Sequence, residues 1–566
     1  MPLVGIALLL CGGVLTQRKS LAQSGVFLRP PLWTDADSDP IPKPKVREVS
    51  ELYAIVNNSW FRPLDVTTKV VKGHERGALN VNAWDEVPNS SWFHNRIGRR
   101  PMTFQDIVTG LEGKDPQPGP WRILRIRDEG YTPKIDIEDP SGSRYVLKFD
   151  LPEKPERNSG AERICTLIMH ASGYNVPYNT IVYFRPEDLT LNEKSYYRDA
   201  LKRRRTMTQD DLQALLQRLH AGPDGRYRGM ASWMLPGEAV GPFVYTGTRE
   251  DDPNDIIPHE LRRELRGMRV LASWINHADV KDVNALDVFI PYNKDIGYVK
   301  HYMLDFGSTM GSGDFIHGPY RVGHEYIYDG AAVGRSFITL GLWMRPWDAQ
   351  GKILYPEIGY FQAELFDPGQ WKPNYPNLAF MRMDDSDAYW GAKLVTAFSD
   401  ETVDRLVESG KYSRPEVTAY LKTVLKQRKD AIGNYWFDRI TPLEDPALER
   451  GEVGFRLLFR DLALERGYAK GDSRTYRVQV LDLDGKVRAG TAEIKAPGPP
   501  VQLPGIVPDR IAPGPADRYG RRPALRLLVE SNRLEGGWAK PMEIILGFQR
   551  ESSSLEILGW THAPKQ

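Results

Sequence analysis

The sequence predicts an α+β protein with two lobes, an N-terminal extension and a C-terminal all-β domain. Three observations support this fold class. Residues 121–184 alternate strand, turn, strand, helix and strand, and residues 258–276 and 386–440 show the apolar spacing of helices. Residues 474–562 alternate apolar and polar side chains over short runs, which is typical of strands.

The composition excludes several classes of protein. Hydrophobic residues make up 41% of the 566 residues and charged residues 26%, which rules out a disordered or coiled-coil chain. The 75 Lys and Arg balance the 74 Asp and Glu, so we expect no nucleic-acid partner. No apolar run is long enough for a bundle of transmembrane helices.

The N-terminal residues are expected to be a signal peptide. Residues 3–15 are apolar, and Ser20 and Ala22 supply the small side chains that precede a cleavage site. No basic residue precedes the apolar stretch, so an uncleaved anchor remains an alternative. Residues 8–11, which end in Cys11, distantly resemble a lipoprotein box, so a lipoprotein is a further alternative. We therefore expect a protein that is exported to the periplasm or the cell envelope, with an association with the envelope.

Changes in composition divide the chain into five predicted segments. They are a signal peptide at 1–22, a Pro- and aromatic-rich extension at 23–112, a first lobe at 113–235, a second lobe at 236–445 and a β domain at 446–566. In the last of these, Asp484 and Gly485 predict a hairpin turn.

The strongest candidate for a functional site follows the predicted helix at 258–276. Asp279 precedes Asn284, and further along Asp305 opens an Asp-Phe-Gly sequence after an apolar run. Phosphoryl transfer needs one carboxylate that orients the attacking hydroxyl, and an Asn and a second carboxylate as oxygen ligands of Mg²⁺. Asp279 is therefore the candidate catalytic base, and Asn284 and Asp305 are the candidate ligands of Mg²⁺ or Mn²⁺. Lys281 can neutralise charge on the transferred group.

A lysine that could bind phosphates lies upstream on a predicted strand at 144–149. Lys148 and Val146 share one face of this strand. This arrangement resembles the kinase strand that presents its lysine to the phosphates of ATP, with an apolar residue two positions earlier under the adenine. Glu162 lies on the next predicted helix and can orient Lys148. Alternatively, Glu162 forms a capping box with Ser159.

Together these motifs resemble the protein-kinase-like superfamily. The catalytic-loop pattern H-R-D-L-K-x-x-N is matched at four positions, with Ala278 in place of the arginine. The matching residues are His277, Asp279, Lys281 and Asn284. Residues 160–177 are similar to the helix-to-strand passage of HipA-type bacterial kinases. The resemblance covers about residues 120–440 and implies a two-lobed fold with ATP and Mg²⁺ between the lobes.

The sequence departs from the kinase pattern in its phosphate-binding loop. The glycine-rich G-x-G-x-x-G sequence is absent, and residues 127–133 contain only Gly130. Phosphate contact would then depend on Gly130 and on the hydroxyl of Thr132. The hinge between the lobes is expected at residues 231–237, with Leu235 against the nucleotide.

The resemblance predicts an ATP- and Mg²⁺-dependent phosphotransferase of the atypical, HipA-like kind that acts on a hydroxyl acceptor of unknown identity. An exported location contains little ATP, however. The alternative is a catalytically silent kinase-like ligand-binding protein of the cell envelope. A third possibility is a structural envelope protein that uses the β domain for attachment.

Overall fold

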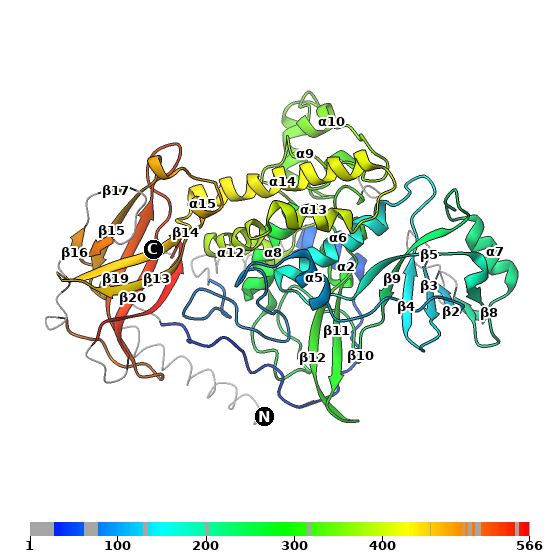
Figure 1. Ribbon diagram of the computed structural model, residues 1–566, viewed down its shortest axis with the longest axis horizontal. Helices are drawn as coiled ribbons and strands as arrows, with labels where there is room; N and C mark the ends of the chain where they lie inside the picture. The colour runs from blue at the N-terminus through cyan, green and yellow to red at the C-terminus, as the bar shows by residue number, and fades with distance from the viewer. Residues whose placement is uncertain are drawn as a thin grey trace.

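The chain folds into a mixed α/β protein. The computed structural model describes residues 28–61, 77–127, 134–198, 203–313, 319–452, 454–490, 493–495, 501–503, 506, 511–549 and 554–564. These residues form four sheets, and the β domain, the helical part and the first lobe follow one another along the longest axis (Figure 1). The predicted signal peptide, Gly130 and Thr132 lie outside the described residues. No helix of the described part has both the length and the apolar character to cross a membrane.

The first lobe is built on an eight-stranded sheet with one helix on each face. Its elements are β2 (Trp121–Arg127), β3 (Lys134–Glu138), β4 (Arg144–Lys148), α6 (Arg157–Ser172), β5 (Asn179–Phe184), β6 (Leu189–Thr190), β7 (Tyr196–Arg198), β8 (Arg204–Thr206), α7 (Gln209–Gln217) and β9 (Tyr227–Trp233). Tyr145 and Leu147 are fully buried and belong to the cluster that includes α7, whereas Val146 and Lys148 are half-buried on the other face. The strand predicted at 144–149 is therefore present as β4.

The second lobe is mostly helical and surrounds the helix predicted at 258–276. Its elements are β10 (Glu238–Ala239), α8 (Arg263–Trp274), β11 (Ala285–Pro291), β12 (Ile296–Met303), α9 (Gly330–Ile338), α10 (Pro346–Gln350), α11 (Leu378–Met381), α12 (Asp385–Thr396), α13 (Asp400–Glu408) and α14 (Pro415–Arg439). The α-helical part starts at Arg263 because Arg262 has an extended backbone. Arg263 and Arg266 are buried and pair with Asp387 of α12 at 3.2 and 2.6 Å. The arginine face of α8 therefore lies inside the protein.

The N-terminal extension packs against elements of both lobes. Its elements are β1 (Ile41–Pro42), α2 (Glu51–Val56), a π-helical turn (Asn57–Phe61) and α5 (Phe104–Gly110). β1 pairs with β12, and Trp92 and Phe93 lie in the same hydrophobic core as α6 and α8. Asp85 Oδ1 lies 2.8 Å from Arg263 Nη1. The extension thus supplies both apolar side chains and a counter-charge to this core.

The C-terminal part consists of two antiparallel sheets around one core, interrupted by a short helix. Its elements are β13 (Leu443–Arg450), β14 (Phe455–Asp461), α15 (Leu462–Glu465), β15 (Thr475–Leu481), β16 (Val487–Gly490), β17 (Ile494–Lys495), β18 (Val501–Leu503), β19 (Arg521–Ser531), β20 (Met542–Gln549) and β21 (Glu556–His562). The predicted turn joins β15 to β16, with Gly485 at a φ of 84°. The helix α15 is the exception to the expected all-β character.

Candidate active site

Three charged side chains from three separate elements meet at the junction of the lobes. Lys148 Nζ lies 3.0 Å from Glu162 Oε1 and 3.1 Å from Asp305 Oδ1. Lys148 ends β4, Glu162 lies in α6, and Asp305 follows β12. Lys148 and Asp305 are 157 residues apart in sequence, so this contact depends on the tertiary fold.

The helix start explains why Glu162 faces Lys148. α6 begins at Arg157, upstream of Ser159, and the carboxylate of Asp150 accepts the backbone N–H of Ser159 at 2.9 Å. Asp150 therefore occupies the capping role, and the capping-box alternative for Glu162 is wrong. Asn179 Nδ2 donates to Glu162 Oε1 at 3.1 Å and holds the carboxylate beside the lysine.

Asp305 is held in an uncommon backbone conformation. Its φ of 60° and ψ of 66° are left-handed, and Phe306 beside it is buried against the ring of His277, with 5.4 Å between the centroids. Such conformations cost free energy and often mark functional positions. The side chain of Asp305 remains 42% exposed, so a cation can reach its carboxylate.

The charges of this cluster shift one another's pKa values. The ammonium of Lys148 lowers the pKa of Asp305 and keeps it ionised. Burial lowers the pKa of Lys148, but the carboxylates of Asp305 and Glu162 outweigh burial and raise it. Burial also raises the pKa of Glu162, against the opposing effect of Lys148. Lys148 is therefore charged at neutral pH.

The predicted catalytic loop forms a second, adjoining cluster. Asn284 Nδ2 donates to Asp279 Oδ2 at 3.1 Å, and Lys281 Nζ lies 3.3 Å from the same oxygen. Burial raises the pKa of Asp279, while Lys281 lowers it. The backbone N–H of Leu304 donates to the carbonyl of Asn284 at 2.9 Å, which joins this loop to the segment of Asp305.

Two charged residues of the site were missed by the sequence reasoning. Lys134 opposes Lys148 in the β3–β4 register, and its charge also lowers the pKa of Asp305. A symmetric hairpin around the turn at 139–143 would have predicted this register. Glu51 of α2 pairs with Lys281 at 2.6 Å, and no local signal indicates a contact so far away in sequence.

The predicted adenine contacts, Val146 and Leu235, stay predictions. A cavity of about 30 Å³ beside Lys148 and Asp305 is lined by described residues that include neither Val146 nor Leu235. Val146 lies on the same strand face as Lys148, whereas Leu235 follows the end of β9, and both are half-buried. Ligand pockets typically measure about 300–1,000 Å³. A nucleotide would therefore require the walls of this cleft to separate.

A much larger cavity lies between the extension and the catalytic loop. It measures about 680 Å³ and is lined by Lys281 and Asp282 on one side and by residues 45–50, 53, 54, 57 and 58 on the other. The buried hydroxyl of Tyr375 also belongs to this wall and has no hydrogen-bond partner among the described residues. An unpaired polar group in a roomy cavity is available to a ligand.

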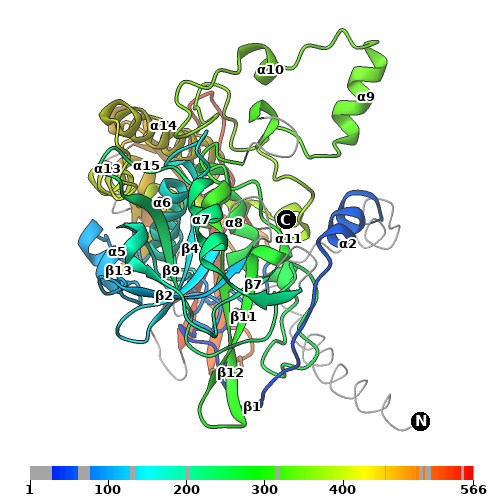
Figure 2. The ribbon, with the colours of Figure 1, turned by 90° about the vertical axis from the view of Figure 1, so that its right-hand side faces the viewer.

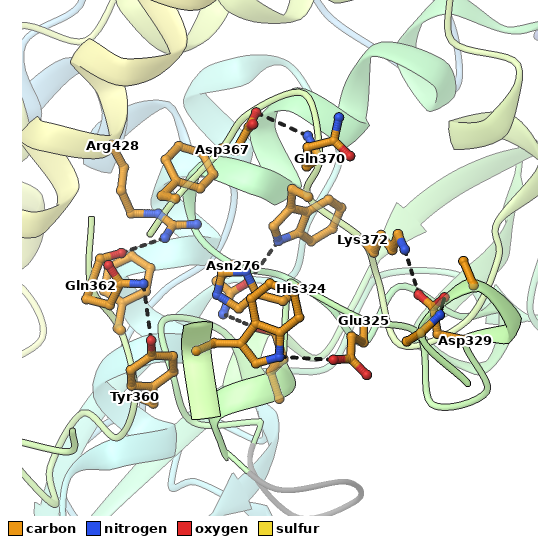
Figure 3. Close-up of a pocket in the computed structure, with 18 of the residues that line it drawn as sticks. Asn276, His324, Glu325, Asp329, Tyr360, Gln362, Asp367, Gln370, Lys372 and Arg428 are labelled. Carbon is orange, nitrogen blue, oxygen red and sulfur yellow. Dashed lines mark hydrogen bonds and ion pairs between the residues drawn. The ribbon is translucent and has the colours of Figure 1, made fainter. Parts of the chain in front are cut away.

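Another cavity, of about 370 Å³, is lined in part by Asn276, which follows α8. Figure 3 shows its ion pair between Asp329 and Lys372, as well as Arg428, which donates to the carbonyl of Gln362. Burial lowers the pKa of Arg428 to about 9. This cavity adjoins the catalytic loop but does not contain Asp279.

The side chains at the cleft have the chemistry that a divalent cation requires. Asp305 offers carboxylate oxygens, and Asn284 donates its N–H groups to Asp279, which leaves its amide oxygen available. The described residues contain no cluster of three or more His, Cys, Asp or Glu side chains suited to a metal. Mg²⁺ is commonly bound by one or two carboxylates, with water and substrate phosphates as its other ligands. Asp305 and Asn284 fit that pattern.

Comparisons with known proteins give distant matches only. No model of a protein family matches the chain, and no curated protein matches it. Two solved structures of a Golgi casein kinase are similar, one with 8% identity, a TM-score of 0.28 and coverage of 69% of this chain and 90% of that chain. The other has Mn and ADP bound, with 12% identity, a TM-score of 0.23 and coverage of 63% and 94%. Both neighbours are named as kinases, and the resemblance to HipA-type kinases stays a prediction.

Proposed function

We propose that this protein is a phosphotransferase of the protein-kinase-like kind, which transfers a phosphoryl group from ATP to a hydroxyl acceptor. The observation that carries the proposal is the position of the Lys148 ammonium between the carboxylates of Glu162 and Asp305. The Asp279–Asn284 cluster adjoins this ion pair. A lysine, its orienting glutamate, a metal-binding carboxylate and a base are the parts that phosphoryl transfer needs.

Each residue has a separate role in this proposal. Lys148 binds phosphate oxygens, and Glu162 positions its ammonium. Asp305 and Asn284 hold Mg²⁺, which neutralises charge on the phosphates when it is bound. Asp279 accepts the proton of the attacking hydroxyl, for which its carboxylate must be ionised, and the nearby Lys281 favours that state. The HipA-type relationship is a finer part of the proposal and is supported only by residues 160–177.

The acceptor is proposed to enter the 680 Å³ cavity. This cavity reaches Lys281, two residues from Asp279, whereas the space beside Lys148 is far smaller. The free hydroxyl of Tyr375 can hydrogen-bond an acceptor there. A nucleotide and an acceptor would then approach the catalytic loop from different sides.

The alternative is a silent kinase-like binding protein of the cell envelope. The ion pair between Glu51 and Lys281 favours it, because Lys281 is engaged by the extension rather than free for a phosphoryl group. Export, expected from residues 1–22, would also separate the protein from cytoplasmic ATP.

Two substitutions distinguish an enzyme from a binding protein. Asp279→Asn should keep the affinity for Mg-nucleotide within about threefold and lower the transfer rate by about 10²- to 10⁴-fold, because the base acts only during transfer. Lys148→Ala should weaken binding and transfer together. The assay is label transfer from γ-labelled ATP to water, to generic hydroxyl acceptors and to the chain itself, with Asp295→Asn as an exposed control. Wild-type protein that binds Mg-nucleotide and transfers nothing would favour the binding protein.

A further inference from the structure

A projecting hairpin formed by α9 and α10 carries strongly exposed apolar side chains that the proposed phosphotransferase does not use. The four most exposed large apolar side chains of the described residues are Phe337, Ile338, Leu340 and Leu342, at 81, 81, 88 and 86%. Met344, on the same hairpin, is 73% exposed. The hairpin projects from the second lobe in Figure 2, and Figure 1 shows it above α14. Exposed apolar patches of this kind mark interaction surfaces.

The turn at the end of the hairpin is strained in a way that presents its side chains outward. Leu340 has a left-handed φ of 51°, which is unfavourable for a bulky residue. Gly341 follows with a φ of 82°, and its N–H donates to the carbonyl of Ser336 at 2.8 Å. The Leu340 side chain is almost fully exposed, so burial does not offset the cost of this backbone conformation. This combination of strain and exposure points to a partner that is absent from the isolated chain.

The base of the hairpin is firmly attached to the lobe. The buried carboxylate of Glu325 accepts from Arg345 Nε at 2.6 Å and from Trp347 Nε1 at 3.0 Å, the latter drawn in Figure 3. The ring of His324 stacks on Trp347 with 4.7 Å between the centroids. Asp329 caps α9 by accepting the N–H of Ala332. The apolar tip is therefore held in place by packed polar contacts.

The residue types of the hairpin are those of segments that bind a lipid bilayer. Between Asp329 and Asp348 the sequence contains two arginines and no acidic residue. The guanidinium groups of Arg335 and Arg345 lie 5.0 and 4.8 Å from the ring of Trp343. An apolar tip above Trp and Arg is typical of segments that enter a membrane interface, where Trp lies at headgroup level and Arg attracts anionic lipid phosphates.

A second exposed apolar segment lies on the same side of the molecule. Leu52, Trp60 and Phe61 of the extension are exposed, and the Trp60 ring lies 5.8 Å from the ring of Tyr328, next to α9. Figure 2 shows α2 and α9 toward the same side. A flat bilayer contacts all apolar residues of one side, whereas a protein groove would receive only one projecting segment.

We propose that this side of the protein docks on a bilayer that contains anionic lipids, with Phe337, Ile338, Leu340 and Leu342 in the acyl region. The proposal does not rest on the phosphotransferase function, because vesicle binding needs neither nucleotide nor metal. Arg335 supplies the electrostatic part, since Arg345 is already paired with Glu325.

The test is co-sedimentation of the full chain with sucrose-loaded phosphatidylcholine vesicles, with and without roughly 30 mol% phosphatidylglycerol. The triple variant Phe337→Ser, Leu340→Ser, Leu342→Ser should lose at least about tenfold in partitioning onto anionic vesicles. The matched control changes Ile256, Val487 and Leu534 to serine, because these side chains are also exposed but lie outside the hairpin. It should bind like wild type, which shows that the loss of exposed apolar side chains outside the hairpin does not weaken partitioning.

A second measurement places the tip itself in the membrane. In a Cys11→Ser background, an environment-sensitive dye on Leu342→Cys should shift to the blue with anionic vesicles, whereas a dye on Ile256→Cys should not. Equal sedimentation of the triple variant and wild type, or no dye shift at Leu342→Cys, would overturn the proposal. The proposal would also be overturned if the wild-type chain bound neither kind of vesicle but formed dimers that the triple variant does not form.

Discussion

Replacement of Lys148 by methionine tests the central ion pair through the stability of the fold rather than through activity. The change removes the ammonium 3.0 Å from Glu162 and keeps an apolar side chain of similar length. The side chain of Glu162 is only 3% exposed, so water cannot replace the lost partner. The variant must therefore keep an unpaired buried carboxylate or protonate it.

Protonation of Glu162 sets an upper limit on the free energy of unfolding that the substitution can remove. Relative to an unfolded pKa of about 4.3, a protonated carboxyl costs about 3.7 kcal/mol at pH 7 and about 1.6 kcal/mol near pH 5.5. Because the folded pKa of Glu162 is raised, its contribution to stability is fully present below the unfolded pKa and is lost as the pH rises. Lys148→Met should therefore destabilise the fold by up to about 3.7 kcal/mol at pH 7 and by less than half as much near pH 5.5.

The assay is urea unfolding of wild type and variant at both pH values. The double variant Lys148→Met, Glu162→Gln should recover most of the loss at pH 7, because it removes the buried charge along with its partner. Lys294→Met changes an exposed lysine and serves as the control. A cost that is equal at both pH values, or that Glu162→Gln does not reduce, would refute the reasoning.

Two further predictions concern the residues around this pair. Asp305→Asn should reduce Mg²⁺-dependent nucleotide binding at least about tenfold and keep the fold, because Asn tolerates the left-handed backbone and the side chain is partly exposed. Titration calorimetry with and without Mg²⁺ measures this, and unchanged binding would contradict the metal role. Glu51→Gln should change stability by less than about 1 kcal/mol, because the pair is partly exposed. It should raise the transfer rate by freeing Lys281, with the exposed Glu535→Gln as control. An unchanged rate would show that Lys281 is not restrained by Glu51.

The parts of the site that were predictable from sequence depend on local patterns. Alternation in β4 placed Lys148 on the face opposite Tyr145 and Leu147, and the helix period at 258–276 located the loop that follows. The prediction that Lys148 and Asp305 share one cleft came from matching motifs in their order along the chain. The structure places the two side chains 3.1 Å apart.

What could not be predicted depends on contacts between distant segments. The arginines of α8 have the spacing of a solvated helix face, yet Arg263 is buried because Asp85 and Asp387 approach it from separate parts of the chain. Likewise, Lys281 pairs with Glu51, which lies far away in the sequence. Charge periodicity alone does not distinguish a solvent-facing stripe from one that receives counter-charges by tertiary packing.

The buried arginines also bear on the status of the extension. A guanidinium in a core is tolerated only when carboxylates and carbonyls surround it. Arg263 donates hydrogen bonds to both the carboxylate and the backbone carbonyl of Asp85. The same carboxylate accepts the N–H of His562, which ends β21. One extension residue therefore links the helix that precedes the catalytic loop to the C-terminal sheet. The extension and the β domain are thus structural parts of the core around α8. Loss of the extension would leave Arg263 with Asp387 as its remaining buried carboxylate, and loss of the β domain would remove the His562 N–H from Asp85.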